Sequence, residues 1–573
     1  MKTEFYVQYD LYDTTALDDA VESSTDNADF GNLGLIKDNS PPPRYGTFEH
    51  NFFVLDGEAE EFPDQPDDLV FFSDTKSDSN GNFADPPILR IDFTENHTSV
   101  GITLHFSEDW PLQIEIRWYD LTGSLKTRKV FHPDNLVYFC ENQVEEYGRI
   151  DIAFQKALPN RYIKLYYVEY GTTFTWGPDV VKTAKLVNDT DPISDKIKTD
   201  KLTFDFVDKN DDFNIGNTEG LHKTFEKKQR MFPYEMVGGE KKALGVFFLD
   251  ENSTTKNISK ISAIDYKGML ENTDFRDGKI YAGYPAGTLI DEIMSAAGID
   301  DYTVDEETAN TPLYGTLKIQ SCQKALREVL FACGSVINSS RRIGVDIHKA
   351  NRQITATIYR RRKFSTTLKT DHYVSDVNVK YKTWTLDANV SEITKGTYGA
   401  GRHTIQLTNP AANMTASAGS IVEQKPYYVV IDVPADTRGE IIISGQKYVG
   451  EELAVLSSIE HIKSGEVRST KTFTGTLLDF EAAQRVADNI LDYYQLQQII
   501  QTKHLSADGK SGDWVEVENT VEGHGNFTAC IESLTTDLAG GFISTAKYRG
   551  YYKLVSDYYY SGEVYAGEGV GII

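Results

Sequence analysis

The four cysteines are the first residues that could do chemistry, because a thiolate is both a nucleophile and a metal ligand. They are Cys140, Cys322, Cys333 and Cys530, and no two form a C-x-x-C pair. A papain-like peptidase needs a cysteine paired with a histidine, and the nearest candidate joins Cys530 to His524. No helix start follows Cys530 to lower its pKa, so a core cysteine is the favoured interpretation. Cys322 and Cys333 lie in one apolar helical stretch and are also expected in the core.

A loop from Asp74 to Phe83 carries oxygen ligands that suggest a cation site. Asp74, Asp78 and Asn80 are followed by Gly81, an arrangement loosely like a calcium loop. The spacing differs from the EF-hand pattern, and turn formation alone explains Asp, Asn and Gly at these positions. We therefore predict no metal ligand here, and calcium binding by the loop is left open.

Two other groups of side chains are typical of binding sites. Trp110, Trp118 and Tyr119 could stack on a sugar ring, although Trp118 lies on the apolar side of its strand and is expected in the core. The longest basic run, Arg360 to Lys363, could contact nucleic acid. Because it is short and lies in an acidic chain, a solvated strand end or ion pairs to an acidic neighbour are favoured.

The sequence contains no signature of a common catalytic site. The P-loop, H-E-x-x-H and G-x-S-x-G motifs do not occur in it. Glycoside hydrolases use paired carboxylates, but a chain with 86 acidic residues offers such pairs by chance. We therefore predict a protein that is not an enzyme, with no catalytic residue, no cofactor and no metal site.

Length and composition restrict the class of protein further. The chain has 573 residues, 12% of them aromatic, and a formal net charge of −28. The aromatic content excludes a disordered acidic chain, and the length predicts several domains. The charge opposes binding to nucleic acid or anionic membranes in general, so no sequence-specific nucleic acid is expected. No segment reaches the ~18 apolar residues of a membrane span and none resembles a signal peptide, so we expect synthesis and folding in a reducing cytoplasm and no membrane insertion.

Apolar periodicity predicts a mainly β protein. Ile114, Ile116 and Trp118 alternate with polar residues, which indicates a half-buried antiparallel strand. Similar alternation recurs through residues 45–171 without an amphipathic helix, and predicts a β-sandwich. Later segments, such as those at 202–208 and 244–250, are also strand-like.

Three helices interrupt the later strands. Thr288 is predicted to cap the first helix, which ends at Gly298, and the second begins near Ser321 and ends at Gly334. Asp479 is predicted to cap the strongest helix. Its apolar stripe comprises Phe480, Ala483, Val486, Ala487, Ile490, Leu491 and Tyr494.

The order of these segments resembles the tail-hub proteins of phages and prophages, also called baseplate hub or tail-associated proteins. The segments that carry the resemblance are LTFDFVD (Leu202 to Asp208), LGVFFLD (Leu244 to Asp250), KISAID (Lys260 to Asp265), ALREVLFACG (Ala325 to Gly334), FEAAQRVADNILDYYQLQQ (Phe480 to Gln498), GDWVEV (Gly512 to Val517) and GGFISTAKYRG (Gly540 to Gly550). Ahead of them, FEHNFFVLDG (Phe48 to Gly57), ADPPILRIDF (Ala84 to Phe93), VGITLHF (Val100 to Phe106) and NRYIKLYYVEYG (Asn160 to Gly171) resemble a galactose- or carbohydrate-binding sandwich found in Firmicutes prophage tail proteins.

The resemblance implies a mainly β, multidomain fold, with a β-sandwich and a hub of two β-barrel-like domains joined by small α+β domains. The predicted division is an N-terminal segment (1–44), the sandwich (45–171), hub barrel 1 (172–282), an α+β domain (283–369), hub barrel 2 (370–475) and a C-terminal helix with strands (476–573). Many long hubs also carry a peptidoglycan hydrolase at the C-terminus. The sequence to Ile573 shows no such domain, which favours a structural hub.

We therefore expect a homotrimeric ring at the distal end of a phage tail or a tailocin-like particle. The partners that the resemblance implies are the tail tube or distal tail protein, a spike or tip protein, the tape measure, other baseplate proteins and a host cell-wall glycan. Two alternatives stay open, a carbohydrate-active or cell-wall-degrading enzyme with a binding sandwich, and a host-surface adhesin. If a trimer lines a conduit, acidic walls would keep passing DNA from adhering.

Overall fold

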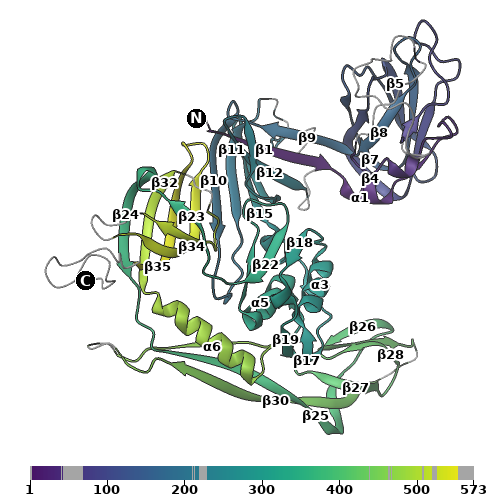
Figure 1. The fold of residues 1–573 in the computed structure, drawn as a ribbon. Helices are drawn as coiled ribbons and strands as arrows, with labels where there is room; N and C mark the ends of the chain where they lie inside the picture. The colour runs from purple at the N-terminus through teal and green to yellow at the C-terminus, as the bar shows by residue number, and fades with distance from the viewer. Residues whose placement is uncertain are drawn as a thin grey trace.

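The computed structural model shows a mainly β protein built from several sheets and six α-helices within its described residues (Figure 1). It describes residues 3–40, 42, 49, 69–209, 211, 213–217, 229–435, 437, 439–462, 465, 467–505, 509–518 and 525–552. Most of the segment FEHNFFVLDG (Phe48 to Gly57) and His524 lie outside these residues.

A seven-stranded sheet folds around one core near the N-terminus, set apart from the rest of the molecule in Figure 1. Its strands are β2 (Val21–Ser23), β3 (Phe71–Phe72), β4 (Ile88–Phe106), β5 (Gln113–Tyr119), β6 (Leu125–Phe131), β7 (Val137–Lys156) and β8 (Lys164–Glu169). The short helices α1 (Thr14–Asp19) and η1 (Leu33–Leu35) precede most of them. The alternation predicted for residues 112–119 is confirmed, because Ile114, Ile116 and Trp118 are fully buried.

A fourteen-stranded sheet forms the largest part of the fold. Its strands are β1 (Thr3–Tyr12), β9 (Gly171–Trp176), β10 (Val181–Asp189), β11 (Lys201–Val207), β12 (Arg230–Val237), β13 (Glu240–Ala243), β14 (Phe247–Thr255), β15 (Ile258–Asp265), β23 (Ile354–Ile358), β24 (Lys363–Thr370), β32 (Gln498–Leu505), β33 (Trp514–Val517), β34 (Phe527–Asp537) and β35 (Ile543–Tyr552).

This sheet has two halves, each with its own core. The main path runs β24-β32-β35-β34-β10-β11-β15-β14-β12-β1-β9, and antiparallel pairing of β10 with β34 joins the halves. Phe204 and Tyr9 belong to one core, and Tyr548 and Ile531 to the other. Strands from both ends of the described chain therefore share one sheet.

Short helices and strands pack beside the junction of the two halves. They are α2 (Tyr266–Met269), β16 (Asp274–Phe275), β17 (Ile280–Pro285), α3 (Ala286–Ala297), β18 (Tyr302–Val304), α4 (Glu306–Ala309), β19 (Pro312–Thr316), β20 (Gln320–Ser321), α5 (Cys322–Cys333), β21 (Ser335–Asn338), β22 (Val345–Lys349) and η3 (Arg360–Arg362). Helices α3 and α5 share their core with α6 (Phe480–Gln495), which lies below the large sheet in Figure 1.

A long two-stranded ribbon extends along α6. It consists of β25 (Asp376–Gly396) paired with β30 (Ile441–Ser458), and β31 (Thr470–Thr474) and β27 (Ala411–Ala416) add to opposite ends of it. A three-stranded sheet of β26 (Gly401–Gln406), β28 (Ser420–Lys425) and β29 (Tyr428–Val433) covers the far end. In the middle, Lys382–Leu386 face Tyr448–Glu452, and neither β27 nor β31 pairs there.

The helix ends agree with the sequence in most places. Ser321 and Asp479 cap α5 and α6 with their side chains, and Gly298 and Gly334 end α3 and α5 in the left-handed conformation. The cap predicted at Thr288 is wrong, because α3 already begins at Ala286. The first-turn N–H of Ala286 donates to Thr311 O. The pairing of β17 with β19 therefore provides the hydrogen-bond acceptor that a capping side chain would otherwise provide.

The stripe predicted for α6 needs one correction. Phe480 is 62% exposed, whereas Ala483, Val486 and Ile490 are buried against α5 and the ribbon. As the first helical residue, Phe480 lies at the end of the packed face, where no neighbouring element covers it.

Candidate functional site: a polar cavity between three parts of the fold

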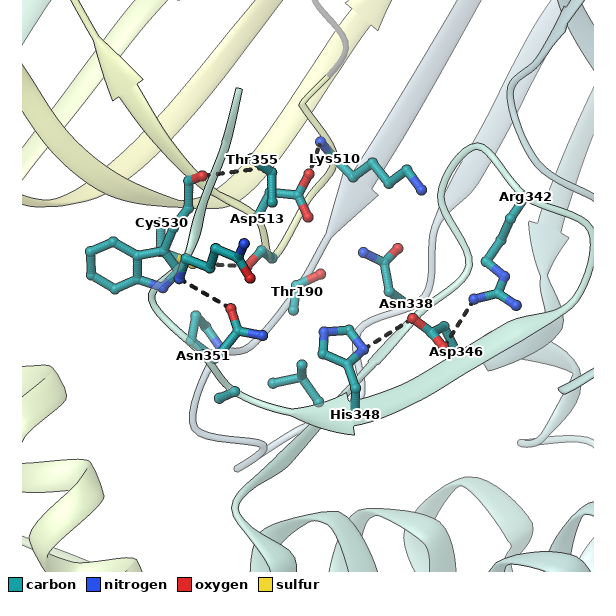
Figure 2. Close-up of a pocket in the computed structure, with 16 residues that line it drawn as sticks. Thr190, Asn338, Arg342, Asp346, His348, Asn351, Thr355, Lys510, Asp513 and Cys530 are labelled. Atoms are coloured by element: carbon teal, nitrogen blue, oxygen red, sulfur yellow. Dashed lines mark hydrogen bonds and ion pairs between the residues drawn. The ribbon is translucent and has the colours of Figure 1, made fainter. Parts of the chain in front are cut away.

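A cavity of about 210 Å³ lies where the fourteen-stranded sheet meets the α+β elements. Three segments far apart in sequence build it: Thr190 after β10, the β21–β22 hairpin, and the turn Lys510–Trp514 that leads into β33. Figure 2 shows His348 and Asp346 on one side, Lys510 and Asp513 on the opposite side, and Thr190 and Asn338 between them.

One side of the cavity is a group of charged side chains on β22 and in the turn before it. Arg342 Nη1 lies 3.0 Å from Asp346 Oδ1, and His348 Nδ1 lies 3.2 Å from Asp346 Oδ2. Thr303 Oγ1 also donates to Asp346 Oδ1, at 2.7 Å. The contact with His348 holds the pKa of Asp346 below its ordinary value, and the same carboxylate raises the pKa of His348. Arg342 Nε is buried without a hydrogen-bond partner.

The opposite side is a tight turn. The backbone N–H of Lys510 donates to Asp513 Oδ2 at 3.0 Å, which closes the turn and orients the carboxylate. Asn338 Nδ2 donates to Ser511 O at 2.8 Å, and Ser511 Oγ bonds Thr190 Oγ1 at 2.9 Å. These hydrogen bonds connect all three segments of the cavity.

A buried cluster of charged side chains holds the backbone next to Asn338 in place. Lys267 Nζ lies 2.8 Å from Asp200 Oδ1 and 3.5 Å from Asp265 Oδ2, and all three residues are at most 1% exposed. Burial raises the pKa of Asp265, and Lys267 acts against that effect. Ser339 Oγ donates to Asp265 Oδ2, so the segment that carries Asn338 is held to the cluster.

A second cavity of about 240 Å³ adjoins the first. The two share Pro192, Ala350, Asn351 and Trp514. The second one extends along α6, where Asn489 and Tyr493 line it. The guanidinium of Arg352 lies 5.4 Å from the centre of the Trp514 ring. The two cavities are therefore adjacent, and we call the pair of them, between the large sheet and α6, the groove.

The structure places all four cysteines in cores. Burial raises the pKa of Cys140 and Cys530, and raises that of Cys322 and Cys333 to about 11, so none of these thiols ionises readily at neutral pH. Cys530 also lines the first cavity, where its Sγ lies 3.5 Å from Gly512 O.

The calcium-like loop is an ordinary turn in the structure. Asp78 Oδ1 accepts the backbone N–H groups of Asn80 and Asn82 at 2.8 and 2.9 Å, which lowers the pKa of Asp78. Asp74 is exposed. Among the described residues, no three His, Cys, Asp or Glu side chains gather as a metal site requires.

The candidate sugar-stacking and basic residues lie elsewhere. Trp118 is a core residue, as predicted, Trp110 packs partly against the same core, and the guanidinium of Arg149 lies 3.8 Å from the centre of the Tyr119 ring. In the basic run, the backbone N–H of Arg360 donates to Glu518 Oε2 at 3.0 Å, and Lys363 Nζ donates to Glu518 O.

Sequence reasoning missed the cavity residues Arg342, Asp346, His348, Lys510 and Asp513. The only local signal was the i, i+2 spacing of Asp346 and His348, which puts both side chains on one face of a strand. Over the described part of the chain, no helix has the length and apolar character needed to cross a membrane.

Comparisons with known proteins find likenesses among solved structures. No family model and no curated protein matches the chain. A tail protein from Neisseria meningitidis is 11% identical, with a TM-score of 0.39, and the match covers 64% of this chain and 92% of that one. A 43 kDa tail protein of a Shewanella oneidensis prophage is 10% identical, with a TM-score of 0.35 and coverage of 64% and 97%. The prophage tail protein gp18 from Listeria monocytogenes is 9% identical, with a TM-score of 0.35 and coverage of 65% and 95%. Similarity at this level does not define what the chain does.

Proposed function

We propose that this chain is a structural hub subunit at the distal end of a phage tail or phage-tail-like particle, where three copies form a ring. The ordered segments that resemble tail hubs support this proposal. They fold into shared cores: KISAID and GGFISTAKYRG lie in the fourteen-stranded sheet, and ALREVLFACG packs with FEAAQRVADNILDYYQLQQ through α5 and α6. The six-part domain division predicted from the sequence belongs to the same proposal.

The observation that carries the proposal is the uncovered middle of the ribbon. Two paired strands on their own are marginally stable in water. Here Lys382–Leu386 and Tyr448–Glu452 are mostly exposed, and the apolar side chains of Leu386 and Val449 in this part are 40% and 57% exposed. Exposed apolar side chains on an otherwise unsupported element are typical of a surface that another chain covers. A neighbouring copy in a ring would cover it.

The test combines solution mass with location. We expect the purified chain to form a species of three times 64.4 kDa by light scattering, and labelled chain to lie at the distal end of tails imaged from lysates. Val449→Glu should shift the assembly to the monomer, because it places a charge in the proposed interface. Leu125→Glu, at a position 52% exposed on β6, is the matched control and should leave the mass unchanged. A chain absent from purified particles would contradict the proposal.

A further inference from the structure

The cavity between Arg342 and Lys510 has more hydrogen-bond donors than the protein uses. The Lys510 ammonium, which carries three N–H donors, has no partner in the described part of the chain, although Lys510 is half-buried. Arg342 Nε is buried and also lacks a hydrogen-bond partner, whereas His348 Nδ1 points at Asp346 Oδ2. The acceptors are largely occupied. Asp346 already pairs with Arg342 and accepts a hydrogen bond from Thr303, and Asp513 accepts one from the backbone N–H of Lys510. Surplus donors in an enclosed site favour an anion.

The charge balance selects the kind of anion. Arg342 and Lys510 offset Asp346 and Asp513, and protonation of His348, which its contact with Asp346 favours, leaves one positive charge. A singly charged carboxylate balances that charge. A phosphate with two negative charges would lie beside two carboxylates without enough cations, which disfavours it.

The size of the cavity indicates that the carboxylate belongs to a side chain. A volume of about 210 Å³ is below the ~300–1,000 Å³ of sites for small molecules. The second cavity adjoins it at Asn351 and Trp514 and lies along α6, which is where the rest of a bound chain would lie. An aspartate or glutamate side chain fits the first cavity, and its flanking backbone fits the second.

We propose that this groove binds an acidic peptide segment of a partner protein, with the carboxylate of one Asp or Glu side chain in the cavity between Lys510, Arg342 and His348. The inference goes beyond the hub function and does not depend on it, since the chemistry of the cavity is the same in a monomer. The ribbon lies outside this groove, so the two proposals concern different surfaces.

The test is calorimetric titration of the full-length chain with two blocked pentapeptides, acetyl-Ala-Ala-Glu-Ala-Ala-amide and its Gln counterpart. We expect the Glu peptide to bind and the Gln peptide to bind at least about tenfold more weakly. Lys510→Gln should weaken binding of the Glu peptide about tenfold, because it removes the charged donor. Lys201→Gln, at an exposed position on β11, is the control and should change nothing.

A second variant keeps the proposal falsifiable if Lys510→Gln does not fold. Asp513→Asn removes a like charge and should tighten binding of the Glu peptide severalfold. Equal binding of the two peptides, no binding of the Glu peptide up to about 10 mM, or tighter binding of inorganic phosphate would each overturn the proposal. None of these outcomes bears on the mass or the location of the assembly, so a failure here is distinguishable from a failure of the hub proposal.

Discussion

Lys267 Nζ lies 2.8 Å from Asp200 Oδ1, and both residues are only 1% exposed. The pair joins α2 to the strand pair β10–β11, because Asp200 also accepts the Asn188 side chain and the Asp189 backbone. Asp265 completes the cluster from the end of β15. The buried ammonium of Lys267 therefore holds α2, β15 and the β10–β11 pair together beside the polar cavity.

Lys267→Met should destabilise this region strongly. The substitution leaves two buried carboxylates without their cation, and breaking a buried pair from one side costs about 3–5 kcal/mol. Hydrogen exchange should show faster opening of β11 and β15. The exposed Lys260→Met on β15 is the control and should change stability by less than about 0.5 kcal/mol. Equal effects of the two variants would contradict the role of the cluster.

Arg549 should be irreplaceable by lysine. Its Nε lies 2.6 Å from Glu532 Oε1, its Nη2 2.5 Å from Asp371 Oδ2, and its Nη1 donates to Leu496 O at 3.1 Å. The planar guanidinium reaches three groups at once, which an ammonium cannot do. Asp371 lies in the connection from β24 to β25, and Leu496 lies in the connection from α6 to β32. Arg549 therefore contacts both connections between the second half of the sheet and the ribbon with α6.

Arg549→Lys and Arg549→Met should therefore both increase hydrogen exchange at the start of β32, by amounts that correspond to about 2–4 kcal/mol. Lys547→Met is the matched comparison. Its ammonium lies 2.6 Å from Glu532 Oε2, but its side chain is 44% exposed, so the loss should be much smaller. Full stability of Arg549→Lys would show that charge alone suffices there.

Gly315→Ala should weaken the contact between β19 and the segment before α6. Gly315 has φ of +127°, and an added Cβ would lie 2.0 Å from the backbone oxygen of Thr476. Because a main-chain atom blocks the space, the strand must shift, at a cost of about 1–3 kcal/mol. Thermal unfolding measures the loss. Gly399→Ala, where no atom lies within 4 Å of the added Cβ, is the control.

His348 should give the cavity a pH-dependent stability. Its contact with Asp346 raises its pKa above the ordinary 6.5, against the effect of burial, and Asp305 and Asp513 add to the rise. A histidine with a raised pKa contributes stability that is fully present below about pH 6.5 and is lost as the pH rises through the folded-state pKa. The guanidinium of Arg342 pairs with the same carboxylate and stays charged over this whole pH range.

An NMR titration of the histidine resonances measures this effect. We expect the His348 pKa above 6.5 in the parent chain, and a lower value in Asp346→Asn, because the variant removes the main cause of the rise. The stability difference between parent and variant should narrow as the pH rises from 6 to 8. A His348 pKa unchanged by Asp346→Asn would contradict the assignment.

Features that depend on near neighbours along the chain are readable from the residue pattern alone. The alternation in β5 placed Trp118 in the core, and Ser321, Gly334 and Asp479 were placed correctly at helix ends. Such features follow from a strand repeat of two, a helix repeat of 3.6 and the unpaired groups of helix termini, all of which lie within a few residues.

How distant segments meet depends on packing in three dimensions. Helix α3 starts where the backbone of Ala286 bonds to Thr311, and not at Thr288. Phe480 is exposed because it lies at the first position of α6, beyond the part of the helix that packs against α5 and the ribbon. The cavity is the clearest case, because Thr190, Asp346 and Lys510 converge through the pairing of β10 with β34 and the packing of β22 beside them. Which strands pair across hundreds of residues depends on the burial of the whole core, and no local pattern in the sequence records that choice.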